Sequence, residues 1–186
     1  MSTFHSGPSI KLHKKITDWF DFDENGVLKV YSGKIDIGQH ISSTLALISS
    51  KITGINYDQI EIIKLNTDKS PNEGKTASSL SVTDSGTAIK AASFTLRKAF
   101  LNFCLLSLNT NFDNIIFENG IVKDKNSNKS VSYWDFAKTE EFNKLIIPEK
   151  INDNEIKLLN YKNNQKIEIK TINDIVTGKY LYVHDM

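Results

Sequence analysis

The sequence predicts an α/β (α+β) fold in which strand and helix patterns alternate. Two observations lead to this prediction. Strand, helix and strand patterns follow one another between residues 27 and 65, and a long helical pattern with one apolar stripe follows a polar loop. The chain of 186 residues is also long enough to bury a core without disulfides. We therefore expect two strand-helix units followed by a hairpin region.

The first unit comprises a strand over residues 27–34 and a helix from about Ser42. Turn residues 23–26 precede the strand, which is rich in β-forming Val and Tyr side chains. Apolar residues then recur at helical spacing, and Gly54 supplies the residue type with which helices commonly end. A second strand is predicted over residues 60–65. The pattern leaves open whether the two strands are parallel neighbours.

A polar loop over residues 66–81 leads to the second helix. The loop has no periodicity, and long loops of this kind in compact domains are often functional. The helix keeps one apolar stripe through Leu106, and Thr83 or Asp84 is predicted as its N-cap. The single Cys104 lies in this stripe, where we expect a buried, structural thiol.

The remaining chain predicts a hairpin region, a linker and the start of another domain. Short strands over residues 115–133 are joined by tight turns, of which Asn119-Gly120 is the strongest hairpin signal. Residues 134–143 predict a short helix, and the Asn- and Lys-rich composition that follows Pro148 is typical of a linker. The last residues, 177–186, predict a strand.

Composition and charge argue against several classes of function. The 23 Lys and Arg nearly balance the 22 Asp and Glu, so the chain lacks the basic footprint of a nucleic-acid-binding protein. Neither a secretory signal nor a membrane span is predicted, so we expect a cytoplasmic protein, with a periplasmic location as the alternative. The four His are widely separated and predict no protein-held metal site.

Two polar, glycine-containing segments, residues 33–40 and 74–86, form the candidate binding site. Each precedes a predicted helix, where the main-chain N–H groups of the first turn can bind an anion. The hydroxyls of Thr76, Ser79 and Ser81 could donate to phosphate or pterin atoms. By composition alone, a Ser/Thr-rich loop that caps the helix is the favoured interpretation.

Taken together, the segments resemble the cofactor-binding region of molybdenum hydroxylase large subunits, the xanthine dehydrogenase and aldehyde oxidase family. The motif GKIDIGQ at residues 33–39 is similar to the family's Gly-x-x-Glu-x-Gly-Gln-Gly, and TASSLS at residues 76–81 to its Thr-Ala-x-Ser loop. The branch that holds the isoquinoline 1-oxidoreductase beta subunits and the large subunits of nicotinate dehydrogenase has this arrangement. The sequence departs at Asp36, where Glu is usual, at His40, where Gly is usual, and at Leu47, where Gln is common.

The resemblance implies that main-chain and hydroxyl groups hold the pterin of a molybdenum-molybdopterin cofactor, expected in its cytosine dinucleotide form. The implied cofactor-binding residues are Gly38, Gln39, Thr76, Ser78, Ser79 and Ser81. The metal would be ligated by the pterin sulfurs, so no metal-ligating or catalytic residue is implied in this chain.

The resemblance also implies a domain organisation. Residues 1–22 are expected to form an N-terminal extension, 23–147 a portion of the molybdenum-cofactor-binding domain, 148–170 a linker, and 171–186 the start of a truncated hammerhead domain. The chain would be the N-terminal part of a large subunit that oxidises an N-heteroaromatic or aldehyde substrate with water as the oxygen source. The general-base glutamate of the family has no match in this chain.

Implied partners are the remainder of the large subunit and a small subunit with [2Fe-2S] clusters, which a chain with one Cys cannot hold itself. Two alternatives stay open. The chain could be a stand-alone module that binds or delivers the cofactor without catalysis. It could also be a small α/β domain without a ligand, whose loops cap helices.

Overall fold

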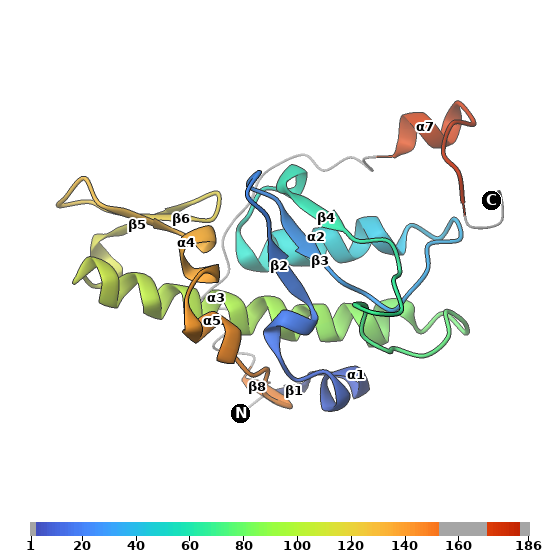
Figure 1. Cartoon of the computed structure of the whole chain (residues 1–186), viewed down its shortest axis with the longest axis horizontal. Coiled ribbons are helices and arrows are strands. Elements are labelled where there is room, and N and C mark those ends of the chain that lie inside the picture. Colours follow the sequence, from blue (N-terminus) through green and yellow to red (C-terminus); the bar gives the residue numbers. More distant parts are fainter. Residues whose placement is uncertain (1–2, 153–170, 183–186) are drawn as a thin grey trace.

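The computed structural model describes residues 3–152 and 171–182. Its two long helices, α2 (Ile41–Thr53) and α3 (Thr87–Leu108), lie side by side and pack against each other (Figure 1). A small sheet lies against α2, and a hairpin region lies at the carboxyl end of α3 (Figure 1). Short 3-10 helices span Ile16–Asp18, Tyr57–Gln59 and Phe112–Asn114.

The small sheet has the order β2 (Phe20–Phe22), β3 (Leu28–Val30) and β4 (Ile60–Ile62). Strand β2 is antiparallel to β3, whereas β3 and β4 are parallel and are joined through α2. The structure thus decides the point that the sequence left open, and the predicted crossover unit is present. Both β3 and β4 are shorter than the predicted strands over 27–34 and 60–65. The continuation of β3 is prevented because residues 32–35 bond to a loop instead of a strand.

Helix α2 ends as predicted. Gly54 follows its last residue with φ 75°, in the left-handed region that favours glycine. A Cβ at this position would lie 2.3 Å from Cε1 of Phe117 and 2.9 Å from a guanidinium nitrogen of Arg97. Both the backbone conformation and the close packing therefore require glycine here.

The start of α3 differs from the prediction. A π-helical turn, Val82–Gly86, precedes α3, and its flanking residue Ser81 is already helical. The predicted N-caps Thr83 and Asp84 lie inside this turn, and the Asp84 N–H donates to the Leu80 carbonyl at 2.8 Å. The prediction of the cap was wrong because the helical backbone begins earlier, as a π turn that periodicity does not reveal.

The hairpin region contains β5 (Ile115–Glu118), β6 (Ile121–Asp124) and β7 (Ser130–Ser132), all paired antiparallel. Asn119 and Gly120 have φ values of 48° and 79°, the left-handed pair that a type I′ turn requires, so the predicted hairpin is confirmed. Instead of one helix over 134–143 there are two, α4 (Tyr133–Ala137) and α5 (Glu140–Lys144). Thr139 separates them, because its extended backbone and hydroxyl start a new N-cap.

The described part of the expected N-terminal extension packs into the same core. Strand β1 (Thr3–His5) pairs antiparallel with β8 (Lys150–Asn152), and helix α1 (Pro8–Leu12) follows β1. The side chains of Ile10 and Trp19 are 0% exposed. Residues 3–22 are thus part of the packed body, because apolar side chains among them are buried in its core.

In the last part of the chain the structure describes residues 148–152 and 171–182. The expected linker over 148–170 begins with strand β8, and its residues 153–170 lie outside the described residues. Helix α7 (Ile172–Val176) opens the expected hammerhead start. The described residues 177–182 of the predicted terminal strand are not a strand, because no described strand pairs with them. Residues 183–186 of this predicted strand lie outside the residues that the structure describes.

Aromatic rings occupy the centre of the core. Tyr133 is 0% exposed, its ring stacks on Phe100 with centroids 3.8 Å apart, and its Oη donates to the Thr53 carbonyl at 3.0 Å. The rings of Phe22, Phe117 and Phe136 lie against this pair, and that of Phe142 packs on Phe22 and Phe136. Tyr133, the first residue of α4, therefore connects α4 to the carboxyl end of α2 and to the middle of α3.

Cys104 lies in α3 and is 0% exposed. Burial raises the pKa of its thiol to about 12, so the group is protonated at neutral pH. The prediction of a buried, structural cysteine is confirmed.

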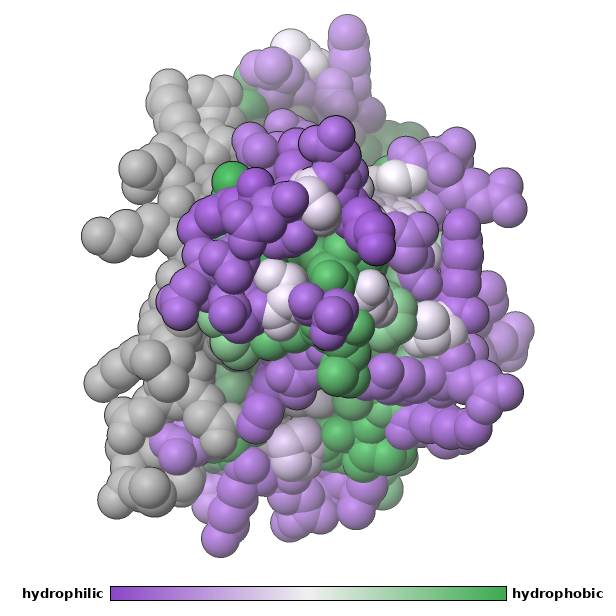
Figure 2. Space-filling model, turned by 90° about the vertical axis from the view of Figure 1, so that its left-hand side faces the viewer, coloured by the Kyte–Doolittle hydropathy of each residue, from purple (hydrophilic) through white to green (hydrophobic). Residues whose placement is uncertain are grey.

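One face of the molecule, at the β5–β6 end, shows apolar side chains gathered between hydrophilic ones (Figure 2). The exposed large apolar residues in this part of the sequence are Leu106, Phe112 and Ile116. Apolar patches on a surface are typical of regions that contact other protein segments. In the ranges that the structure describes, no helix is long and apolar enough to cross a membrane.

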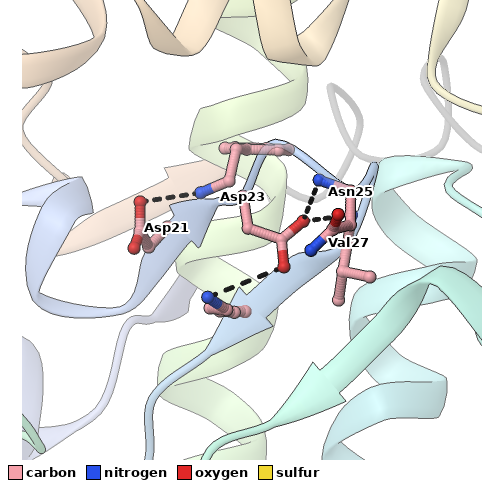
Figure 3. A network of polar contacts seen from close by, with 6 residues as sticks. Asp21, Asp23, Asn25 and Val27 are labelled. Atoms are coloured by element: carbon pink, nitrogen blue, oxygen red, sulfur yellow. Dashed lines mark hydrogen bonds and ion pairs between the residues drawn. The ribbon is translucent and has the colours of Figure 1, made fainter.

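The turn between β2 and β3 is held by Asp23 (Figure 3). Its Oδ1 accepts hydrogen bonds from the N–H groups of Asn25 and Val27, each at 2.9 Å, and its Oδ2 lies 3.6 Å from Nζ of Lys29. The bond from Val27, with smaller contributions from Asn25 and Lys29, lowers the pKa of the Asp23 carboxyl. The ionised carboxylate thus stabilises the turn that positions β3.

Replacing Asp23 with Ala is expected to lower the Tm at pH 7 and to have less effect in acid. The pKa of the folded state lies below the unfolded value of roughly 3.9. The contribution of the carboxylate is therefore complete above the unfolded pKa and is lost as the pH falls through the folded pKa. Thermal melts followed by circular dichroism at pH 7 and pH 3 measure the Tm difference between wild type and Asp23→Ala. Glu24→Ala is the control from the same turn. A Tm difference that grows in acid would contradict this account.

Candidate functional site

The first predicted segment is anchored at its start by a buried carboxylate. Ser32 Oγ and the Gly33 N–H both donate to Oε2 of Glu73, each at 2.8 Å. Ser32 is 1% exposed and Glu73 is 9% exposed, so these bonds are shielded from water. Buried carboxylates need such donors, because an unpaired buried charge is costly.

The next two residues continue this row of bonds. The buried ammonium of Lys34 donates to the carbonyl oxygens of Glu73 at 2.7 Å and Lys75 at 3.2 Å. The Ile35 N–H donates to Oγ1 of Thr76 at 2.9 Å. The accepted bond leaves the hydroxyl proton of Thr76 available to donate elsewhere.

Four consecutive residues, 32–35, therefore bond to residues 73–76, and we call these two paired stretches the clasp. The stretches approach closely at Gly33. A Cβ on Gly33 would lie 2.2 Å from the Pro71 carbonyl oxygen and 2.9 Å from the Glu73 nitrogen. The absence of a side chain at Gly33 thus permits the clasp, and the two segments predicted separately from the sequence form one unit.

The start of α2 differs from the expectation of outward-pointing donors. The carboxylate of Asp36 accepts hydrogen bonds from the N–H groups of Gly38 at 3.1 Å, His40 at 3.2 Å and Ser42 at 3.3 Å. Among the N–H groups of the first helical turn, that of Ser42 is therefore taken by a side chain of the preceding loop. A negative carboxylate at this helix start also disfavours an anionic ligand there.

Gln39 folds back onto its own loop. Its Oε1 accepts from the Ile37 N–H at 2.7 Å, and its Nε2 donates to the Ile35 carbonyl at 2.8 Å. Ile35 also bonds to Thr76, so hydrogen bonds link Gln39 and Thr76 through one residue. The second proton of the Gln39 amide nitrogen remains for a further acceptor.

The loop after the clasp has an uncommon backbone. Ser78 and Ser79 have φ values of 58° and 56°, and both are exposed. Non-glycine residues with positive φ are uncommon and often lie at ligand-binding sites. Ser81 is buried at the start of the π turn. The loop therefore presents the hydroxyls and main-chain groups of Ser78 and Ser79 to its surroundings.

A groove of about 750 Å³ lies beside the first segment. Lys34 and Asp36 line it together with residues of α2 and β4, and Tyr180 and Tyr182 close it from the carboxyl-terminal side. The two tyrosine rings lie 4.8 Å apart, and a Cβ at Gly38 would be 4.0 Å from the Tyr182 ring. Burial, with a smaller contribution from Asp36, raises the pKa of Tyr180.

The groups that stay available are hydroxyls, main-chain groups and the exposed Lys75. Such donors suit a ligand rich in oxygen and nitrogen acceptors, such as a phosphate or a heteroaromatic ring. Sequence reasoning missed Lys34, Glu73 and the capping role of Asp36. An Asp shortly before a helix is a usable capping signal, whereas nothing local marks Lys34 or Glu73, whose contacts lie about 40 residues away in sequence.

The chain is similar to a curated dehydrogenase subunit and to solved structures of CO dehydrogenase. A curated nicotinate dehydrogenase subunit of Pseudomonas putida is 24% identical over 115 residues, which cover 62% of this chain and 10% of that protein. The solved structure of reconstituted CO dehydrogenase from Oligotropha carboxidovorans matches with a TM-score of 0.53 and 20% identity. The match covers 70% of this chain and 17% of that chain, and a Cu,Mo-CO dehydrogenase in its carbon monoxide reduced state matches equally.

The predicted fold class is confirmed by this structural likeness. The chain spans about a tenth of the length of the curated relative that it matches. A family model described as the molybdopterin cofactor-binding domain matches residues 1–167, which include the clasp and the loop after it. The chain therefore belongs to the molybdopterin cofactor-binding domain family.

Proposed function

We propose that this chain contributes one part of the pocket for a molybdenum-molybdopterin cofactor in the large subunit of a molybdenum hydroxylase. The observation that carries the proposal is the exposed, left-handed pair Ser78 and Ser79, held directly after the clasp in a chain of this family. Its hydroxyls and main-chain groups would donate to the pterin or to its phosphate. When bound, the cofactor supplies the redox chemistry, while the residues of this chain bind and orient it.

The six implied residues would have unequal roles. Thr76, Ser78 and Ser79 have hydrogen-bond donors that their own contacts leave available. Ser81 directly precedes the π turn, which supports the loop. The Gly38 N–H is bonded to Asp36, so Gly38 would allow close approach of the ligand to an exposed loop instead of donating. Gln39 would contribute its remaining amide proton.

The finer details rest on the resemblance of the two motifs. We propose oxidation of an N-heteroaromatic or aldehyde substrate with water as the oxygen source, and the cytosine dinucleotide form of the cofactor. The remainder of the large subunit and a small [2Fe-2S] subunit would be the partners. We also propose a cytoplasmic location.

Cofactor retention in the assembled enzyme tests the proposed function. The double variant Ser78→Ala, Ser79→Ala should lower bound molybdenum and pterin per enzyme by about tenfold or more, because hydrogen bonds to charged groups contribute roughly 1.5–3 kcal/mol each. Ser78→Gly, Ser79→Gly keeps the left-handed backbone and separates the hydroxyl contribution from the main-chain contribution. The exposed Ser130→Ala on β7 is the matched control.

Wild-type cofactor content in the double Ala variant would overturn the role of the serine hydroxyls. Wild-type content in the Gly variant as well would leave only main-chain contacts at these positions. If the isolated 186-residue chain bound the cofactor at one per chain, the stand-alone binding or assembly module would be favoured instead.

A further inference from the structure

We infer that Glu73 is the positioning residue of the site. It sets the conformation of the loop over residues 76–81 through its own hydrogen bonds and does not contact the ligand. The inference rests on the proposed function for its consequence in cofactor binding. Its structural part, the control of the loop by Glu73, stands on the contacts of the clasp alone.

Glu73 bonds to three consecutive residues of the opposite stretch. Its carboxylate accepts from Ser32 and Gly33, and its carbonyl accepts from the ammonium of Lys34. The side chain and the main chain of Glu73 thus both hold the stretch over residues 32–34. Movement of Glu73 would break these three bonds together, so the clasp is expected to open as a unit.

The burial of Glu73 is unusual for its surroundings. It is 9% exposed, while its neighbours Asn72 and Gly74 are exposed. Its Oε1 is buried and accepts no hydrogen bond among the residues that the structure describes. Burial of a carboxylate with one oxygen unsatisfied is costly. The bonds to Ser32 and Gly33 offset this cost only when the clasp is closed, so Glu73 couples its own burial to closure.

The position of Glu73 links the clasp to the proposed ligand loop. Thr76 lies three residues after Glu73 and bonds back to Ile35, and the left-handed pair follows at Ser78 and Ser79. A left-handed backbone is strained in a non-glycine residue and persists only when the surroundings impose it. The clasp at one end and the π turn at the other supply that restraint.

Amide hydrogen exchange of the full chain without cofactor tests this coupling. The reporter is the Ile35 N–H, because its acceptor is Thr76 and not Glu73. In Glu73→Ala, exchange of the Gly33 and Ile35 amides and of residues 76–80 should accelerate by about tenfold or more, with α3 amides unchanged. In Thr76→Val, which removes only the local acceptor, Ile35 should accelerate while Gly33 stays protected.

The conservative variant Glu73→Gln keeps one acceptor oxygen for Ser32 and Gly33. It should restore most of the protection of Gly33 and Ile35 that Glu73→Ala loses. Glu118→Ala, an exposed acidic residue on β5, is the control and should leave all these amides unchanged. Unchanged exchange of Ile35 and residues 76–80 in Glu73→Ala would overturn the inference.

The same variants in the assembled enzyme separate this inference from the proposed function. Both are supported if Glu73→Ala opens the loop and accelerates cofactor release, as the serine variants do. Loop opening without any change in cofactor release would overturn the link to the ligand. If the serine variants lose cofactor but Glu73→Ala leaves exchange unchanged, the proposed function holds and the positioning role fails.

Discussion

Replacing Gly33 with Ala is expected to destabilise the protein by about 3 kcal/mol, at the upper end of the usual cost of overpacking. The new Cβ would lie 2.2 Å from the Pro71 carbonyl oxygen and 2.9 Å from the Glu73 nitrogen. Both atoms belong to the backbone, so no side-chain rotation relieves the clash. The two stretches must move apart, which breaks the buried bonds at Ser32 and Lys34.

Urea unfolding of Gly33→Ala and wild type, followed by circular dichroism, measures this loss. Gly86→Ala is the matched control. Gly86 has φ −61°, and its added Cβ would meet only side-chain atoms, Cδ1 of Ile48 at 3.2 Å and Cγ1 of Val82 at 3.5 Å. This control is expected to be neutral or stabilising by up to about 1 kcal/mol, since Ala favours helix over Gly. Equal stability of Gly33→Ala and wild type would refute the close approach at Gly33.

Replacing Tyr133 with Ala is expected to have an equal or larger effect, a loss of about 3–5 kcal/mol. The ring is 0% exposed and stacks on Phe100 at 3.8 Å, so its removal leaves a cavity among rigid aromatic neighbours. Its hydroxyl also donates to the Thr53 carbonyl at the end of α2. Loss of the residue therefore loosens α2, α3 and α4 together.

Tyr133→Phe separates the two contributions. It keeps the ring and removes only the hydrogen bond to Thr53, for an expected loss of about 1–3 kcal/mol. The shift of the urea midpoint at constant m-value measures each loss. Tyr133→Phe as damaging as Tyr133→Ala would mean that the hydroxyl, and not the packing of the ring, dominates the contribution of this residue.

Local signals in the sequence predicted much of the fold. The helical spacing before Gly54, the stripe that contains Cys104 and the Asn119-Gly120 turn all led to elements that the structure confirms. Each of these signals acts within one helical turn or one hairpin, where residue type directly limits the backbone. The π turn over Val82–Gly86 was missed because it lies before Ile89, where the apolar stripe that predicted the helix begins.

The two segments of the candidate site were predicted, but the hydrogen bonds that join them were not. The motifs at residues 33–39 and 76–81 identified where to look, and the match of the family model to residues 1–167 agrees with the resemblance. At the start of α2, Asp36 accepts from the N–H group of Ser42 and from those of Gly38 and His40 just before the helix, which the sequence did not predict. The individual roles of the six proposed residues stay predictions.

The sequence by itself determined the alternation of strands and helices, the end of α2 at Gly54 and the hairpin turn at Asn119-Gly120. It also contains the two motifs by which the family is recognised. Only the tertiary structure decided that residues 3–22 pack into the body of the molecule and that Glu73 and Lys34 join the two motifs. The reason is the range of the interactions. Backbone preferences act between neighbours, whereas a buried carboxylate acquires its partners only when the chain brings distant segments into contact.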